Sequence, residues 1–134
     1  MLTQKAKYGL KALGYLARHY AQGPILIADI AASEKIPLKF LQGILLLLKQ
    51  NNILASKKGL GGGYFLNDKP KNINLATVLR IINGPIAMLP CVSLNFYERC
   101  KDCNEKKCTL HNIFEQVRDA TLKIFDKKTL KDLM

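Results

Sequence analysis

A mainly helical fold with one small β-hairpin and a long C-terminal helix is predicted by three features of the sequence. Apolar residues recur at helical spacing over residues 4–20 and 37–51, a glycine-rich stretch at 58–63 separates two strand-like runs, and a second long helical pattern fills 108–127. With 134 residues, 49% of them hydrophobic, the chain has room for one core. We therefore expect one compact domain overall and exclude a multidomain enzyme.

Three helices are expected in the first half of the chain. The first covers residues 4–20, where apolar residues lie three or four positions apart, and Gly23-Pro24 ends it. The second covers residues 27–33, and the third begins at Pro37 and runs to about Asn51, because proline suits the first turn of a helix. The side chains expected to point inward from the first and third helices are Ala6, Leu10, Leu13, Ala17, Tyr20, Leu41, Ile44, Leu45 and Leu48.

A glycine-rich hairpin follows the third helix. Strand-like runs at residues 53–57 and 64–67 are joined by Lys58-Gly59-Leu60-Gly61-Gly62-Gly63. A nucleotide-binding glycine loop leads from a strand into a helix, whereas this loop leads into a second strand. We therefore expect the glycines to form the tip of a hairpin.

Three helices followed by a hairpin is the element order of a winged helix-turn-helix. A fourth helix at residues 75–82 completes this region, which we place at 1–84. Residues 85–107 are expected to form an irregular cysteine loop, and 108–134 a dimerisation helix with a short tail. The apolar stripe of that helix has the narrow spacing of a coiled-coil seam and should pack against a second copy of the chain. The stripe consists of Leu110, Phe114, Val117, Thr121 and Ile124.

Positive charge dominates the sequence and gathers in its first half. The chain has 21 Lys and Arg residues against 10 Asp and Glu, a formal net charge of +11, and eleven of the basic but three of the acidic residues fall within residues 1–71. Such a balance favours a polyanionic partner, and together with the element order it indicates double-stranded DNA. No apolar run approaches the roughly 20 residues of a membrane helix, so a cytoplasmic protein without membrane contact is expected.

Eight residues are expected to meet DNA. In a winged helix the third helix enters the major groove, which places Lys39 and Gln42 at base edges. Phosphate contacts are expected from lysines of the first helix and the hairpin, and from hairpin glycines, whose backbone amides have no side chain in front of them. These residues are Lys7, Lys11, Lys57, Lys58, Gly61 and Gly62.

The cysteines form a second candidate site. Cys91, Cys100, Cys103 and Cys108 fall within a single stretch of the chain, and His111 follows three residues after the last of them. Clustered thiols in a reducing compartment indicate metal binding or redox sensing rather than structural disulfides. Thiolates bind iron–sulfur clusters, four of them can bind zinc, and thiols without metal can react directly. All three possibilities remain open at this point, with Cys108 and His111 on the same helical face.

Several motifs occur in a characteristic order along nearly the whole chain. They are Lys7-Tyr8-Gly9-Leu10, Phe40-Leu41-Gln42, the hairpin loop ending in Gly63-Tyr64, Asn83-Gly84-Pro85, and the cysteine loop before a long helix. Together they resemble the Rrf2 family of bacterial transcription regulators. The resemblance implies a winged-helix homodimer that binds a palindromic operator and regulates transcription.

The same resemblance implies an iron–sulfur cluster, of the 2Fe–2S type, that reports redox, iron or nitric oxide status. Its ligands would be three of the loop cysteines, with His111 after the last one, and either Cys100 or Cys103 as the middle ligand. Lys7 stands where other members of the family carry a carboxylate ligand from the partner subunit. Zinc or unligated thiols are the alternatives for this site.

No catalytic arrangement is recognisable in the sequence. The chain lacks a Ser-His-Asp set, paired carboxylates and an H-E-x-x-H motif, and a Cys-His pair in a loop gives little support for nucleophilic catalysis. We therefore expect no enzymatic activity. The main alternative to a regulator is a nucleic-acid-binding module without a regulatory role.

Overall fold

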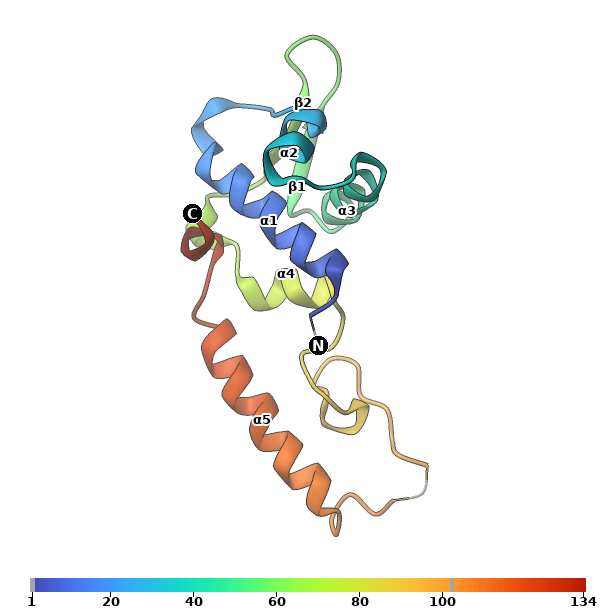
Figure 1. Ribbon diagram of the computed structural model, residues 1–134. Helices are drawn as coiled ribbons and strands as arrows, with labels where there is room; N and C mark the ends of the chain where they lie inside the picture. Colours follow the sequence, from blue (N-terminus) through green and yellow to red (C-terminus); the bar gives the residue numbers. More distant parts are fainter. Residues whose placement is uncertain (1, 102) are drawn as a thin grey trace.

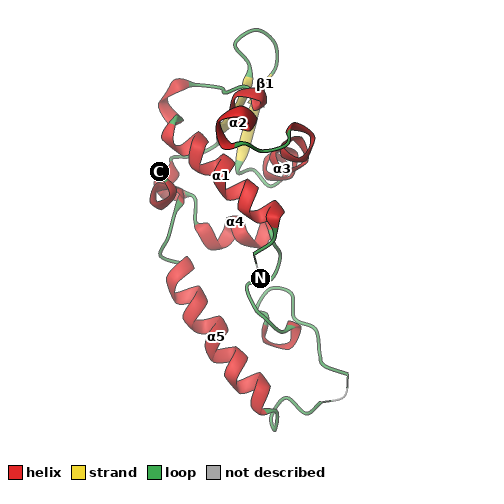
Figure 2. Cartoon of the chain, viewed as in Figure 1, coloured by secondary structure: helices red, strands yellow, loops and turns green. Residues whose placement is uncertain are grey.

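The computed structural model describes residues 2–101 and 103–134 and has five α-helices and one antiparallel hairpin in the described part (Figures 1 and 2). The predicted mainly helical fold with a small hairpin is confirmed. The helices are α1 (Gln4–Arg18), α2 (Ile27–Glu34), α3 (Leu38–Gln50), α4 (Leu75–Ile82) and α5 (Thr109–Phe125), and the strands are β1 (Leu54–Lys57) and β2 (Gly63–Leu66).

Helix α1 starts at a side-chain cap and ends earlier than predicted. The Thr3 hydroxyl accepts a hydrogen bond from the Ala6 amide at 3.1 Å, which satisfies one of the free donors of the first turn. At the other end the chain tightens into a 3₁₀ turn at Tyr20–Gln22. The prediction that Tyr20 points inward is therefore wrong, because its ring has left the helical register and is exposed.

The core lies among helices α1 to α4, with α1 in the middle of the group (Figure 1). The four α3 residues predicted to face inward, Leu41, Ile44, Leu45 and Leu48, are all buried. They pack in one cluster with side chains of α1 and with Ile30 of α2. The prediction that these four residues form the packing face of α3 is therefore confirmed.

The hairpin is extended by the segment between α1 and α2. Leu54 pairs with Leu66 and Lys57 with Gly63 across the two strands. The backbone of Ile25 pairs with Tyr64 through two hydrogen bonds of 2.8 Å, so a third segment borders the sheet. This close approach requires glycine at position 63, where a Cβ would lie 2.3 Å from the Ile25 carbonyl oxygen.

The chain returns to the helical group after α5. Thr129 and Asp132 form a capping box for a short 3₁₀ helix at Leu130–Leu133, which packs against α1. The Leu130 side chain is fully buried, and its amide donates to the Ile73 carbonyl at 3.0 Å. Residues 129–134, predicted as a tail of the dimerisation helix, thus lie against the first part of the chain.

Helix α5 itself runs outside the helical group (Figure 1). Leu122 is its one buried residue, whereas Leu110, Val117 and Ile124 of the predicted stripe are exposed and Phe114 and Thr121 are half-buried. A large part of its apolar face therefore has no cover within the single chain. None of the described helices combines the length and apolar character needed to cross a membrane.

Candidate functional site

One face of α3 is free for contact with a partner. Lys39, Gln42, Gly43 and Leu46 are exposed and lie at positions i, i+3, i+4 and i+7, opposite the buried stripe of the same helix. This face offers one cation, one amide and a glycine that allows close approach. Its polar chemistry thus rests on the two residues, Lys39 and Gln42, that the sequence singles out.

The lysines of α1 also face solvent. Lys7 and Lys11 are exposed and line a shallow hollow with Arg18 and Glu34. Arg18 donates to Glu34 at 2.6 Å, so its charge is largely neutralised. Among the described residues no ion pair engages Lys7 or Lys11, which leaves both charges available to an anionic partner.

Of the two hairpin glycines that were predicted to contact DNA, one is accessible and the other is not. Lys57, Lys58 and Gly61 are exposed. Gly62 is buried, its amide donates to the Gly59 carbonyl at 3.0 Å, and a Cβ there would lie 2.3 Å from the Lys57 carbonyl oxygen. The amide of Gly62 is thus already used within the turn, while Gly61 remains accessible.

Three of the four cysteines approach one another. Hydrogen bonding of the Cys103 thiol to Cys100, its burial, and a further hydrogen bond to Cys108 raise the pKa of Cys103 to about 12. The amide of His111 donates to the Cys108 sulfur at 3.5 Å and lowers the pKa of that thiol. All four cysteines are free thiols. Cys103 is therefore the central member of a chain of three sulfurs.

His111 lies in the first turn of the helix that Cys108 caps, and its ring carries an unpaired nitrogen. Its Nδ1 is buried and has no hydrogen-bond partner among the described residues, while its Nε2 lies 3.9 Å from the Glu115 carboxylate. Sulfur atoms with an orphaned imidazole nitrogen are a donor set that suits an iron–sulfur cluster. Within the described residues, however, no group of three or more His, Cys, Asp or Glu side chains is arranged to hold a metal ion.

The fourth cysteine lies at the start of the loop. Cys91 is half-buried in the 3₁₀ turn Pro90–Val92. Tyr97 donates a short hydrogen bond to Glu105, which raises the pKa of the tyrosine. This hydrogen bond joins the middle of the loop to its later part, whereas Cys91 lies beside the Arg118 contact and is not among the sulfurs that interact with Cys103.

Arg118 connects α5 to the turn that carries Cys91. Its side chain is only 12% exposed, and Nη1 donates to the Val92 carbonyl at 2.8 Å. The guanidinium also contacts Asp119 at 2.8 Å and Glu115 at 3.5 Å. Sequence reasoning missed this residue because an arginine within an amphipathic helix gives no signal that distinguishes it from a solvated one.

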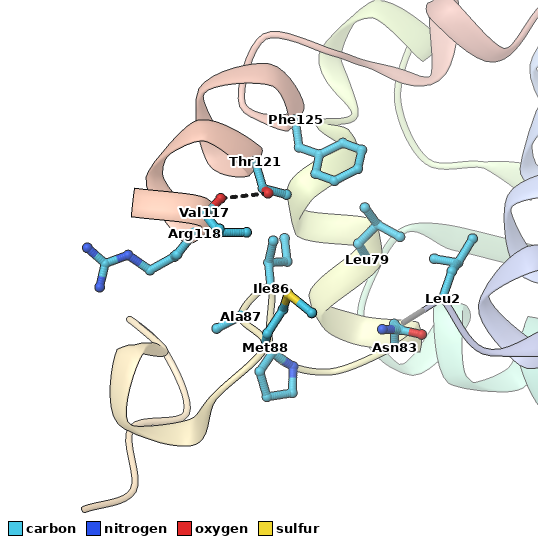
Figure 3. A pocket seen from close by; sticks show the side chains of 11 residues that line it. Leu2, Leu79, Asn83, Ile86, Ala87, Met88, Val117, Arg118, Thr121 and Phe125 are labelled. Carbon is cyan, nitrogen blue, oxygen red and sulfur yellow. Dashed lines mark hydrogen bonds between the residues drawn. The ribbon is translucent and has the colours of Figure 1, made fainter. Parts of the chain in front are cut away.

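An apolar cavity of about 250 Å³ separates α4 from α5. Figure 3 shows Val117, Thr121 and Phe125 of α5 on one side and Leu79 of α4 with Ile86 on the other. The cavity lies where α5 meets the first part of the chain. Packing at this junction is therefore incomplete.

Comparisons with known proteins agree with this arrangement. A profile of the Rrf2 family, described as an iron-dependent transcriptional regulator, matches residues 2–134. An rrf2-like HTH-type transcriptional regulator of Rhodobacter capsulatus is 39% identical over 100% of this chain and 92% of that protein. The regulator IscR of Pectobacterium atrosepticum is 27% identical over 99% of this chain and 78% of that protein.

Solved structures show the same fold. CymR, the global cysteine regulator of B. subtilis, superposes with a TM-score of 0.80 at 27% identity and covers 99% of this chain and 95% of that chain. T. potens IscR superposes with a TM-score of 0.75 at 23% identity and covers 99% of this chain and 85% of that chain.

Proposed function

Because the chain belongs to the Rrf2 family, it is a DNA-binding transcriptional regulator and not an enzyme, and we propose that it acts as a homodimer whose operator affinity depends on an iron–sulfur cluster in the cysteine loop. The observation that carries the sensing proposal is the hydrogen bonding of Cys103 to two other sulfurs, together with the orphaned Nδ1 of His111 three residues after Cys108. The operator is a palindromic duplex, because a two-fold dimer presents two equal reading surfaces.

The exposed face of α3 supports its assignment as the recognition helix. The Gln42 amide can pair bidentately with adenine, and Lys39 can reach guanine or a phosphate. Gly43 and Leu46 add no hydrogen-bonding groups to this face. With so few polar readers we expect DNA shape to contribute to selection. Lys7, Lys11, Lys57, Lys58 and the Gly61 amide would bind the phosphate backbone.

The uncovered face of α5 supports the homodimer. Leu110, Ile113 and Ile124 are 58%, 54% and 60% exposed, and they share one face of the helix with Val117. Monomeric proteins rarely expose an apolar patch of this kind along a helix. A second copy of α5 offers the same apolar stripe, as an isologous interface requires.

We assign Cys91, Cys103, Cys108 and His111 as the cluster ligands. Cys103 is preferred to Cys100 as the middle ligand because it is half-buried and hydrogen-bonded to Cys108, whereas Cys100 is exposed. A bound 2Fe–2S cluster supplies one-electron redox chemistry at a potential that an imidazole ligand raises. These residues come from both ends of the loop, so the ligand set joins the turn of Cys91 to the start of α5.

Arg118 supports a connection between the sensor and the dimer helix. It holds α5 to the carbonyl of Val92, the residue next to Cys91. A ligand that favours one arrangement of loop and helix shifts the population toward that arrangement, and operator affinity then changes by the reciprocal coupling.

Anaerobic purification with iron and sulfide analysis tests the cluster. Wild-type protein should be coloured and contain iron and acid-labile sulfide in equal amounts. Cys103→Ala and His111→Ala should lose both, while Cys100→Ala, the matched control in the same loop, should keep them. Colourless wild-type protein without iron would contradict the proposal, and loss of colour in Cys100→Ala would contradict the choice of Cys103.

Binding to DNA tests the reading surface. Gln42→Ala should reduce discrimination against wrong bases by roughly 1–3 kcal/mol at its position, because it removes a bidentate contact. Lys58→Ala should instead weaken specific and random duplexes alike and lower the salt slope by about one unit. An equal loss on all duplexes for Gln42→Ala would show that Gln42 reads no base.

The chain of three sulfurs also favours a second candidate, a thiol sensor without metal. A peroxide would oxidise two neighbouring thiols to a disulfide and would itself be reduced to water and an alcohol. The solved CymR is described as a global cysteine regulator, and it matches this chain at 27% identity. Mass spectrometry of iron-free protein after peroxide treatment distinguishes the two candidates, since a disulfide that changes operator affinity would favour the thiol sensor.

A further inference from the structure

The tip of the hairpin is a built turn that fixes one residue at its apex. The Gly62 amide donates to the Gly59 carbonyl at 3.0 Å, which closes a four-residue β-turn around Leu60 and Gly61. Gly61 has φ +72°, the conformation that the third residue of a type II turn requires. Leu60 therefore occupies the second position of the turn and is one of its two central residues.

The side chain of Leu60 is completely exposed. Its relative exposure is 104%, the highest of any large apolar side chain in the described part of the chain. The other large apolar side chains that are more than half exposed lie mostly on α5 and in the cysteine loop, with Leu2, Leu26 and Met134 elsewhere, and none of them exceeds 63% exposure. Leu60 stands apart from these, because glycines surround it on the tip. The fold therefore gains no apolar contact from this leucine.

The surroundings of Leu60 suit duplex DNA. Lys57 and Lys58 precede it, and the segment 54–66 contains no acidic residue. Figure 1 shows the hairpin loop projecting beyond α2 and α3. When a recognition helix lies in the major groove, a neighbouring wing reaches the backbone or the adjacent minor groove. Apolar side chains that enter the minor groove act as wedges between base steps, while nearby cations hold the phosphates.

We propose that Leu60 is an apolar wedge that enters the minor groove beside the recognition helix and partly unstacks one base step. The proposal rests on the proposed DNA-binding function of α3 and the hairpin, and it adds a selection device that uses no hydrogen bond. Pyrimidine–purine steps unstack most easily, so the operator should carry a TA, CA or TG step at the position of the hairpin tip. Leu60 is thus a specificity-determining residue.

Selection from a random duplex library tests this proposal. Wild-type protein should enrich a pyrimidine–purine step flanking each half-site, and Leu60→Ala should lose this preference by roughly 5- to 20-fold in relative affinity, the range expected for losing the apolar contacts of one leucine. Leu60→Met, which keeps an apolar side chain of similar length, should retain most of it. The salt slope should be the same for wild type and Leu60→Ala, because no charge is removed.

A fluorescent base provides the second readout. 2-Aminopurine placed at the flanking step should brighten when wild-type protein binds and should stay quenched with Leu60→Ala. Lys58→Ala is the matched control on the same tip: it should weaken binding to all duplexes and still brighten the base at saturation. Leu94→Ala, an exposed leucine of the cysteine loop, should behave as wild type.

The outcomes separate this proposal from the function on which it rests. If wild type selects a palindrome while Leu60→Ala keeps both the step preference and the fluorescence change, the wedge is overturned and the DNA-binding function stands. If wild type enriches no palindrome at all, both fail. If Leu60→Ala binds DNA normally but loses association with another protein, Leu60 is a protein contact and the wedge is again overturned.

Discussion

The first and second parts of the chain differ in how they use their apolar residues. Helices α1 to α4 and the hairpin bury theirs in one cluster, which includes Leu130 from the C-terminal turn. Helix α5 buries only Leu122, and the cysteine loop leaves Leu94 and Phe96 exposed. Apart from the C-terminal turn, the core of this chain is therefore built from the residues up to the end of α4.

The two parts obtain their stability from different sources. The first part closes its core within one chain and provides a rigid support for the α3 face and the hairpin. The second part is held by single contacts, among them the Arg118 clamp on Val92, and leaves one helical face for other molecules. A regulator needs such a division, because regions that move are those with few buried contacts.

Among single substitutions, the largest effect on stability is expected in the core of the first part. Leu13→Ala should lower the free energy of unfolding by about 2–5 kcal/mol, because Leu13 is fully buried and its removal leaves a cavity. Chemical denaturation at a concentration where the protein is monomeric measures this. Leu110→Ala on α5 is the matched control and should change the value by less than about 0.5 kcal/mol. An equal loss of unfolding free energy in the two variants would contradict the contrast between the two parts.

The next effect concerns the uncovered face of α5. Ile113→Asp should weaken self-association by about 2 kcal/mol or more, because it buries an unpaired charge within the proposed dimer contact. Sedimentation equilibrium measures the change, and circular dichroism checks that the monomer remains folded. Asn112→Asp introduces the same charge one position earlier, on another exposed face of α5, and should associate as wild type. A wild-type protein that stays monomeric would remove the basis for the dimer.

A smaller effect is expected from the contact that joins the two parts. Arg118→Ala should destabilise the turn at residues 90–92 by about 1–3 kcal/mol, because the buried Val92 carbonyl loses its donor. Hydrogen exchange should speed up at the Val92 and Ser93 amides and stay unchanged in α1. Arg118→Lys should restore only part of the protection, since lysine lacks the planar fork. Unchanged exchange at both amides would show that Arg118 does not hold the turn.

The smallest effect lies at the base of the hairpin. Hydrogen bonds from the Asn72 side chain at 2.9 Å and the Lys69 amide at 2.7 Å lower the pKa of Asp68 below its ordinary value of 3.8. A pKa that is lower in the folded state gives a stabilising contribution that is present above the unfolded pKa and is lost as the pH falls through the folded pKa. NMR titration should place the Asp68 midpoint below 3.8. Asp68→Asn should remove this part of the acid dependence of stability, and a midpoint above 3.8 would contradict the assignment.

The elements that could be predicted from the sequence are those that neighbouring residues determine. The buried stripe of α3 and the bounds of α4 follow from apolar spacing and from the Asn74 cap, and both are confirmed. Tyr20 fits the same spacing as α1, but a 3₁₀ turn takes it out of the helix. The spacing of apolar residues does not indicate a change from α-helical to 3₁₀ hydrogen bonding. The prediction that Tyr20 points inward is therefore wrong.

The rest depends on contacts between distant residues. Leu130 is fully buried because the chain turns back after α5, and this return is decided by Ile73 and α1 rather than by neighbours in sequence. The Thr129–Asp132 capping pattern could have indicated a helical start there. The position of Cys103 between two other sulfurs and the clamp of Arg118 have no local signal, because loop conformation decides both.

The return of the chain after α5 has a mechanical consequence. Leu75 donates to the Lys128 carbonyl at 2.9 Å, and Gly14 leaves room for the Leu133 carbonyl, where a Cβ would come within 3.2 Å. The C-terminal end of α5 is thus a fixed pivot, and its 17 residues form a rigid lever of about 25 Å. A tilt about that pivot displaces the Cys108 end most and the end next to α4 least. In the proposed dimer, we therefore expect a change at Cys108 to act on the partner subunit through the exposed face of α5. This would alter the distance between the two proposed recognition helices.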